Sequence, residues 1–200
     1  MSKADWLYLS TTSGSGNATV SVSTHKEYTG RNARNTTLSI TAANVEAKTV
    51  TVTQGGKPAY VDAVDNVTAE KKGQTVTISG KSNAYRLAFS LGSGNLEVSM
   101  PSHFTAAGIS VSNGASITGD PGASAEYDFS IIIDVPENRA LVDRTRQIIV
   151  SDDEGHSDVC LLTQTAGDAY LTVSKNTIEL SYTGHAVSFD ISSNTSWIIS

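Results

Sequence analysis

The stretch that decides the fold is residues 169–200, AYLTVSKNTIELSYTGHAVSFDISSNTSWIIS. In it, Val187, Phe189 and Ile191 alternate with polar residues, which is the period of a strand with one buried face. Shorter strand signals stand on either side of this run. So few strands cannot bury both of their faces, and their edges stay unpaired. We therefore expect residues 169–200 to be completed by strands from elsewhere.

A matching stretch stands at the other end of the chain. Residues 4–24, ADWLYLSTTSGSGNATVSVST, contain a glycine-rich turn followed by Ala18, Val20 and Val22, which alternate with small polar residues. When residues 4–24 are written after the final SSNTSWIIS, the two stretches read as one uninterrupted β module. Each end of the chain therefore looks like half of a module.

An internal repeat supports this division. Pairs of similar residues stand 110 positions apart, as positions 34 and 144 do; they are Arg34 and Arg144, Ile40 and Val150, Thr53-Gln54 and Thr163-Gln164, and Ala59-Tyr60 and Ala169-Tyr170. After a shift of one residue the match continues; these pairs are Gly73 and Gly184, Val76 and Val187, Ile78 and Phe189, and Ser82-Asn83 and Ser193-Asn194. The middle of the chain is therefore one complete copy.

The composite pattern resembles the BACON family, β-sandwich modules common in Bacteroidetes and in the gut phages that infect them. The pieces that carry the resemblance are Ser193-Asn194-Thr195-Ser196-Trp197, Asp5-Trp6-Leu7, Ser13-Gly14-Ser15-Gly16-Asn17, Arg34 before a strand, and Thr49-Val50-Thr51-Val52-Thr53-Gln54 as the last strand. They cover most of residues 4–56 and 169–200. The resemblance implies an immunoglobulin-like sandwich, and the family's proposed carbohydrate-binding role makes a glycan ligand an open alternative.

The predicted fold is all-β, with tandem immunoglobulin-like (BACON-like) sandwiches. Residues 1–56 are expected to form the second half of a module, residues 57–167 a complete module, and residues 168–200 the first half of another. In the middle module we expect about seven strands near residues 75–79, 85–90, 96–100, 109–112, 127–135, 146–151 and 159–164.

Composition excludes several classes of function. A net charge of −6 lacks the basic excess of a nucleic-acid-binding protein. No stretch approaches the ~20 apolar residues that cross a bilayer. The chain starts MSKADW, without a signal peptide, which favours a protein made without a secretion signal, provided that Met1 is the natural start.

Residues for catalysis or for a cofactor are not apparent. His25, His103, His156 and His185 fall in predicted loops with no shared spacing, and Cys160 matches Val50 in the repeat, as a small buried residue would. The carboxylates of Asp152-Asp153-Glu154 favour a solvated turn over a calcium site, because no EF-hand spacing is present. We predict a non-enzymatic protein with no cofactor and no metal.

The two half-modules can meet within one chain or between two. The link from Gln164 to Leu171 spans at most about 20 Å, which is short for a return past a whole module. We therefore expect residues 168–200 of one subunit to complete residues 1–56 of the next, head to tail. The alternative is that the sequence ends fall without regard to module boundaries. The expected interface residues are Trp6, Leu7, Val20, Leu38, Ile40, Val52, Val187, Phe189, Trp197 and Ile199.

The expected function is that of a structural protein in the virion of a Bacteroidetes phage, as a capsid decoration, auxiliary head or fibre protein with capsid proteins as further partners. The alternative is a carbohydrate- or mucin-binding module of a protein secreted by, or displayed on, a Bacteroidetes bacterium. Its candidate glycan contacts are Tyr8, Tyr28, Tyr85 and Tyr127.

Overall fold

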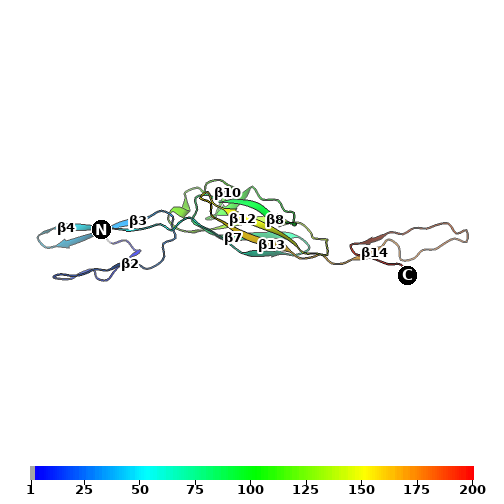
Figure 1. Ribbon diagram of the computed structural model, residues 1–200, viewed down its shortest axis with the longest axis horizontal. Helices are drawn as coiled ribbons and strands as arrows, with labels where there is room; N and C mark the ends of the chain where they lie inside the picture. Colours follow the sequence, from blue (N-terminus) through cyan, green and yellow to red (C-terminus); the bar gives the residue numbers. More distant parts are fainter. Residues whose placement is uncertain (1–2) are drawn as a thin grey trace.

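The computed structural model describes residues 3–200 and is all-β apart from one short 3-10 helix. Figure 1 shows an elongated molecule with a sandwich in the middle and a thin, open unit at each end. We call residues 3–56 the amino-terminal unit, residues 57–167 the middle module, and residues 168–200 the carboxy-terminal unit. The two end units lie at opposite ends of the middle module, so they do not contact each other within one chain.

The middle module contains two sheets. One has the strand order β10-β9-β11-β7-β5. Its strands are β5 (Val61–Ala63), β7 (Gln74–Ser82), β9 (His103–Ala106), β10 (Ile109–Ser112) and β11 (Tyr127–Val135). The other sheet has the order β6-β13-β12-β8. Its strands are β6 (Asn66–Ala69), β8 (Ala88–Gly94), β12 (Arg144–Ser151) and β13 (Ser157–Gln164).

A single apolar core lies between these sheets. β11 reads YDFSIIIDV, and its alternate side chains from Tyr127 to Val135 are buried. They pack with Ile78 of β7 on their own sheet and with Ile148 and Leu162 of the opposite sheet. The period-2 pattern of the sequence therefore places one face of each sheet in the core.

The middle module differs from expectation in two regions: the short strands β5 and β6 before β7 were not predicted, and the segment before β11 differs as well. Residues 96–100 form no strand, although Leu96 is buried, whereas β9 and the 3-10 helix η1 (Pro121–Ala123) were not predicted. Both lie in the segment that precedes β11. A short polar run there carries no clear period, so its pairing is decided by the neighbouring strand and not by local pattern.

The end units are smaller and flatter. The amino-terminal unit pairs β1 (Leu7–Leu9) with β2 (Val22–Thr24), and β3 (Arg34–Ala42) with β4 (Val45–Gln54). The carboxy-terminal unit pairs β14 (Leu171–Val173) with β15 (Ile191–Ser193). The alternating run around residues 187–191 was expected to be a strand. Only its last residue, Ile191, lies in a strand, since residues 185–190 have no strand beside them.

Candidate functional site

Each end unit reproduces the strand pairs found within one half of the middle module. β3 and β4 pair Arg34 with Gln54, as β12 and β13 pair Arg144 with Gln164. Likewise, β14 and β15 repeat the register of β5 and β7. The local hairpins and pairings are therefore formed in every copy of the repeat.

The strand pairs that join the two halves of the middle module have no counterpart in residues 3–200 of the end units. In the middle module, β7 pairs with β11 along its whole length, β6 pairs in parallel with β13, and β8 pairs with β12. These three pairings connect residues 66–94 with residues 127–164. Within residues 3–200, β4 pairs only with β3 and β15 only with β14, and the segments equivalent to β6 and to most of β7 form no strand.

The apolar side chains of these open halves are exposed, unlike their repeats in the core. Val187 is 43% exposed where Val76 is 5% exposed, and Ile40 is 58% exposed where Val150 is fully buried. Val20, Phe189, Trp197 and Ile199 are also exposed, and Trp6, Leu38 and Val52 are half-buried. Nine of the ten residues expected at the interface therefore keep surface that a partner could cover.

Leu7 is the exception and corrects the expectation. It is fully buried within its own amino-terminal unit. Its backbone N–H donates to the carbonyl of Ala4, and its own carbonyl accepts from the Lys3 ammonium. Because its side chain is already covered, Leu7 has no surface left to offer a second subunit.

The four candidate glycan contacts have different surroundings. Tyr8 is half exposed and packs edge-on against His25, and Tyr85 is exposed on the middle module. Tyr28 is half-buried, because the Arg34 guanidinium lies over its ring and over that of Trp6, 4.2 and 4.4 Å from the ring centres. Within residues 3–200, these four tyrosine rings make no contact with one another.

Tyr127 was expected as an exposed platform, and this was wrong. Its ring is 6% exposed in the core, and its hydroxyl donates to the carbonyl of Ala84 at 2.8 Å. Burial raises the pKa of the Tyr127 phenol to about 12. The residue occupies an inward position of β11, so the alternation of that strand, read to its first residue, would have placed it inside.

A buried asparagine links the amino-terminal unit to the middle module. The amide group of Asn83 donates to the carbonyls of Thr29, Lys57 and Pro58, and its oxygen accepts from the N–H of Tyr60, at 3.1 to 3.2 Å. One fully buried side chain thereby ties together two segments of the chain from different units.

The junction between the middle module and the carboxy-terminal unit is built from the same bonds. Asn194 donates to the carbonyls of Arg139 and Asp168 and accepts from the N–H of Tyr170. The Gly167 N–H donates to Ala140, just as the Lys57 N–H donates to Gly30 at the first junction. The repeat of Ser82-Asn83 at Ser193-Asn194 was visible in the sequence, but the role of the asparagine was not predicted.

The first junction carries further contacts that the second lacks within the described residues. The Arg31 guanidinium forms a two-pronged ion pair with the Asp120 carboxylate, at 2.9 and 2.7 Å. The N–H groups of Arg31 and Asn32 donate to carbonyls of η1. At the second junction, the repeat places Leu141 at the position of Arg31, and Leu141 is exposed.

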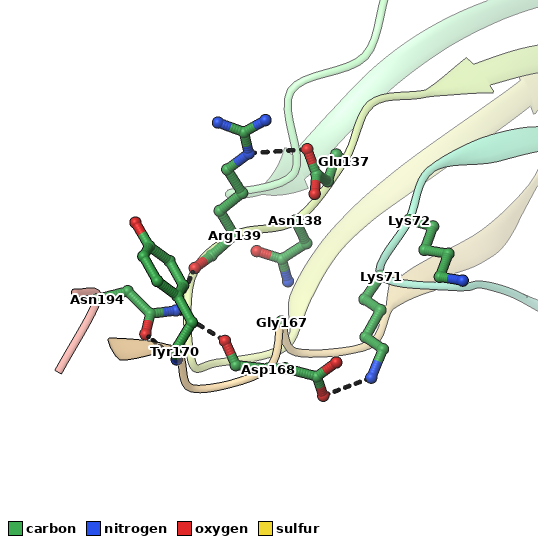
Figure 2. A pocket seen from close by; sticks show the side chains of 9 residues that line it. All are labelled: Lys71, Lys72, Glu137, Asn138, Arg139, Gly167, Asp168, Tyr170 and Asn194. Atoms are coloured by element: carbon green, nitrogen blue, oxygen red, sulfur yellow. Dashed lines mark hydrogen bonds and ion pairs between the residues drawn. The ribbon is translucent and has the colours of Figure 1, made fainter. Parts of the chain in front are cut away.

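A polar hollow of about 330 Å³ lies at the second junction (Figure 2). Two ion pairs, Lys71 with Asp168 and Arg139 with Glu137, account for four of its five charged side chains. Asn194 reaches across one wall of the hollow to the backbone of Arg139 and Asp168. Because most of its charges are paired with one another, we interpret the hollow as part of the junction.

The residues considered for catalysis are separated from one another. His156 lies against its own turn, with Nδ1 2.7 Å from a carboxylate oxygen of Asp152. Cys160 is fully buried, as expected, and burial raises the pKa of its thiol to about 11. No group of three or more potential metal ligands gathers among residues 3–200. The same part of the chain contains no helix long and apolar enough to cross a membrane.

Comparison with known proteins gives one match by sequence family. Residues 1–55 match the family model BACON, described as "Putative binding domain, N-terminal". No curated protein matches the chain.

Nine chains of solved structures match this chain. One is the NMR structure of a protein from Bacteroides thetaiotaomicron, with 13% identity and a TM-score of 0.27, covering 56% of this chain and 90% of that one. Another is an endo-fucoidan hydrolase from glycoside hydrolase family 107, with 13% identity and a TM-score of 0.33, covering 83% of this chain. The match spans only 22% of the hydrolase. The match of residues 1–55 to the BACON family model confirms the resemblance that was drawn from the sequence.

Proposed function

We propose that this protein is a non-enzymatic structural protein whose copies join head to tail. In this arrangement, the carboxy-terminal unit of one copy completes the amino-terminal unit of the next. The observation that carries the proposal is the difference in strand pairing. Pairs within each half-module are formed in both end units, whereas the pairs between halves are formed only in the middle module.

The proposed partner is a second copy of this chain. The middle module contains a first half and a second half packed around one core, and the end units carry the same two halves by repeat. Their exposed apolar residues stand where the middle module has core residues, as Val187 does for Val76. A second copy therefore supplies a surface of the required shape and polarity. Such an interface would be apolar and permanent, like a domain core divided between two chains.

A virion is the setting that we propose for this assembly. BACON-like modules occur in phages of Bacteroidetes, and an assembly that repeats one contact suits a decoration, head-associated or fibre protein, with capsid proteins as additional partners. Binding of host or mucin glycans is the second candidate, favoured by the description of the matched family as a binding domain.

Sedimentation at increasing protein concentration tests the assembly. We expect species larger than one subunit, and we expect the substitution Phe189→Ser to abolish them, because it removes an apolar side chain from the open face. Ile132→Ser is the control, since Ile132 is also an exposed apolar residue but lies on the outer face of β11. A monomer at every concentration would overturn the proposal.

The glycan alternative has its own measurement. Binding to a glycan array that disappears in Tyr8→Ala or Tyr85→Ala would favour it, because both rings are exposed. Tyr127→Phe, which changes a buried ring, serves as the control. An array without binding in the native protein would eliminate this candidate and leave the assembly proposal unaffected.

A further inference from the structure

We infer a specific register for the contact between two copies, and this inference rests on the proposed function. Residues 185–193 of one copy pair antiparallel with residues 16–24 of the second, with Phe189 opposite Val20. Residues 177–180 of the first copy pair in parallel with Thr51–Gln54 of the second, with Ile178 opposite Val52. The middle module supplies the template for both pairs.

The antiparallel pair follows from β7 and β11. There Ile78 stands opposite Ile131, and Val76 stands opposite Ile133. All four side chains are buried in the core. The sequence repeat places Phe189 at the position of Ile78 and Val187 at the position of Val76. One side of the pair is thus fixed by the repeat alone.

The alternation of apolar residues fixes the other side. Ala18, Val20 and Val22 must face the core, because a slip of one residue would turn all three outward and bring serines and threonines inward. Matching Val20 to Ile131 keeps them inside and places Val20 opposite Phe189 and Val22 opposite Val187. The loop that follows then holds one residue more than its counterpart after β11.

The parallel pair follows from β6 and β13. Leu162 stands opposite Val67, and Gln164 opposite Ala69. The repeat converts the first pair into Val52 and Ile178, both apolar. The Gln164 side chain donates to the carbonyls of Glu70 and Pro136. Gln54 stands at its position, so its amide group would donate to the carbonyl of Ser181 in the other copy.

A turn of the carboxy-terminal unit is already shaped for this contact. Gly184 has φ 71° and donates to the carbonyl of Ser181, as Gly73 with φ 77° donates to Glu70. A Cβ at Gly73 would strike the backbone of residues 135–137 at 2.7 to 2.9 Å, whereas a Cβ at Gly184 would meet nothing within 4 Å. The turn is the same, but within the described residues nothing packs on Gly184 as residues 135–137 pack on Gly73.

Cysteine cross-linking between two different variants tests the register. The background is Cys160→Val, because the repeat has Val50 at that position. Mixing Val20→Cys protein with Phe189→Cys protein under mild oxidation should give a covalent dimer. Ser21→Cys with Phe189→Cys is the off-register control, since a neighbouring residue points to the opposite face of the strand. We expect about tenfold less dimer from it, because its sulfurs lie too far apart.

A second pair, Val52→Cys with Ile178→Cys, tests the parallel contact in the same way, with Thr51→Cys as its control. Sedimentation of each mixture before oxidation separates the possible failures. Assembly with equal cross-linking of matched and control pairs, or with none, would overturn the register and leave the proposed function standing. Absence of assembly in the native protein would overturn the proposed function itself.

Discussion

The middle module and the two end units share a sequence repeat, yet among residues 3–200 the buried apolar cluster lies in the middle module. Ile78 is fully buried, whereas Phe189, its counterpart, is 38% exposed. Both stand at equivalent positions after the same glycine turn. Short pairings are present in every half, whereas this burial is observed where two halves lie side by side in the middle module.

Truncation of apolar side chains should give the largest difference in stability between the middle module and the end units. In the free subunit, Ile78→Ala should cost about 2–5 kcal/mol of unfolding free energy, and Phe189→Ala less than about 0.5 kcal/mol, because only the first leaves a cavity. In the assembled state Phe189→Ala should approach the cost for a core phenylalanine, about 3–5 kcal/mol. Urea unfolding at low and high protein concentration measures both. Equal costs at low concentration would mean that Phe189 is buried without a partner.

The two junctions give the next largest contrast. Asn83→Ala removes four hydrogen bonds and leaves buried carbonyls unpaired, so we expect a cost of about 2–3 kcal/mol. Asn194→Ala removes three hydrogen bonds at a half-buried position, and about 1 kcal/mol is expected. Hydrogen exchange at the Tyr60 and Tyr170 amides reports each junction separately. A larger effect at Asn194 would contradict the order of burial.

The ion pair present at only one junction allows a smaller test. Arg31→Leu converts the first junction to the residue that the repeat has at Leu141. Loss of the partly buried pair with Asp120 should cost about 1 kcal/mol after allowance for solvent screening. Exchange at the Asn32 amide, which donates to Ala123, should accelerate several-fold. If Asp120→Asn left that rate unchanged, the pair would be irrelevant to the junction.

The smallest expected effect depends on pH. A hydrogen bond from Tyr60, and then one from Lys81, lowers the pKa of Glu126 below its ordinary 4.5. A carboxyl group with a lowered folded-state pKa stabilises the fold above pH 4.5, and this contribution is lost as the pH falls through the folded value. Glu126→Gln should therefore narrow the difference in stability between neutral and acidic solution. If the loss of stability in acid were the same in Glu126→Gln, other carboxylates would be responsible for it.

Much of the fold could be predicted because its signals are periodic. The strand Tyr127–Val135 was predicted at its observed bounds, since five alternate apolar residues leave one way to face a core. The strand β9 could not be predicted, because its pairing depends on β11 and not on its own sequence pattern. Exposure of the candidate residues was harder to predict: the alternation of β11 places Tyr127 inside, whereas no short pattern reveals that Leu7 is buried.

The candidate site was predictable only in outline. The alternation of Val187 and Phe189 marks one half of a module, but a single chain gives that strand no neighbour, so the extended pairing is missing from residues 185–190. The asparagine junctions were missed for another reason. The Ser-Asn pairs at positions 82–83 and 193–194 identify a repeat, but the carbonyls that each amide group reaches are set by loops far apart in the sequence.

The bonds that the two asparagine junctions share have a mechanical consequence. In the proposed assembly, they would relate successive modules by one repeated operation, which gives a closed ring where the rotation closes and an open fibre where it does not. The two tips of an open fibre would differ chemically, one offering the edge of β4 and the other the turn at Gly184. Elongation at those tips would then proceed at unequal speeds, giving a fibre with a direction.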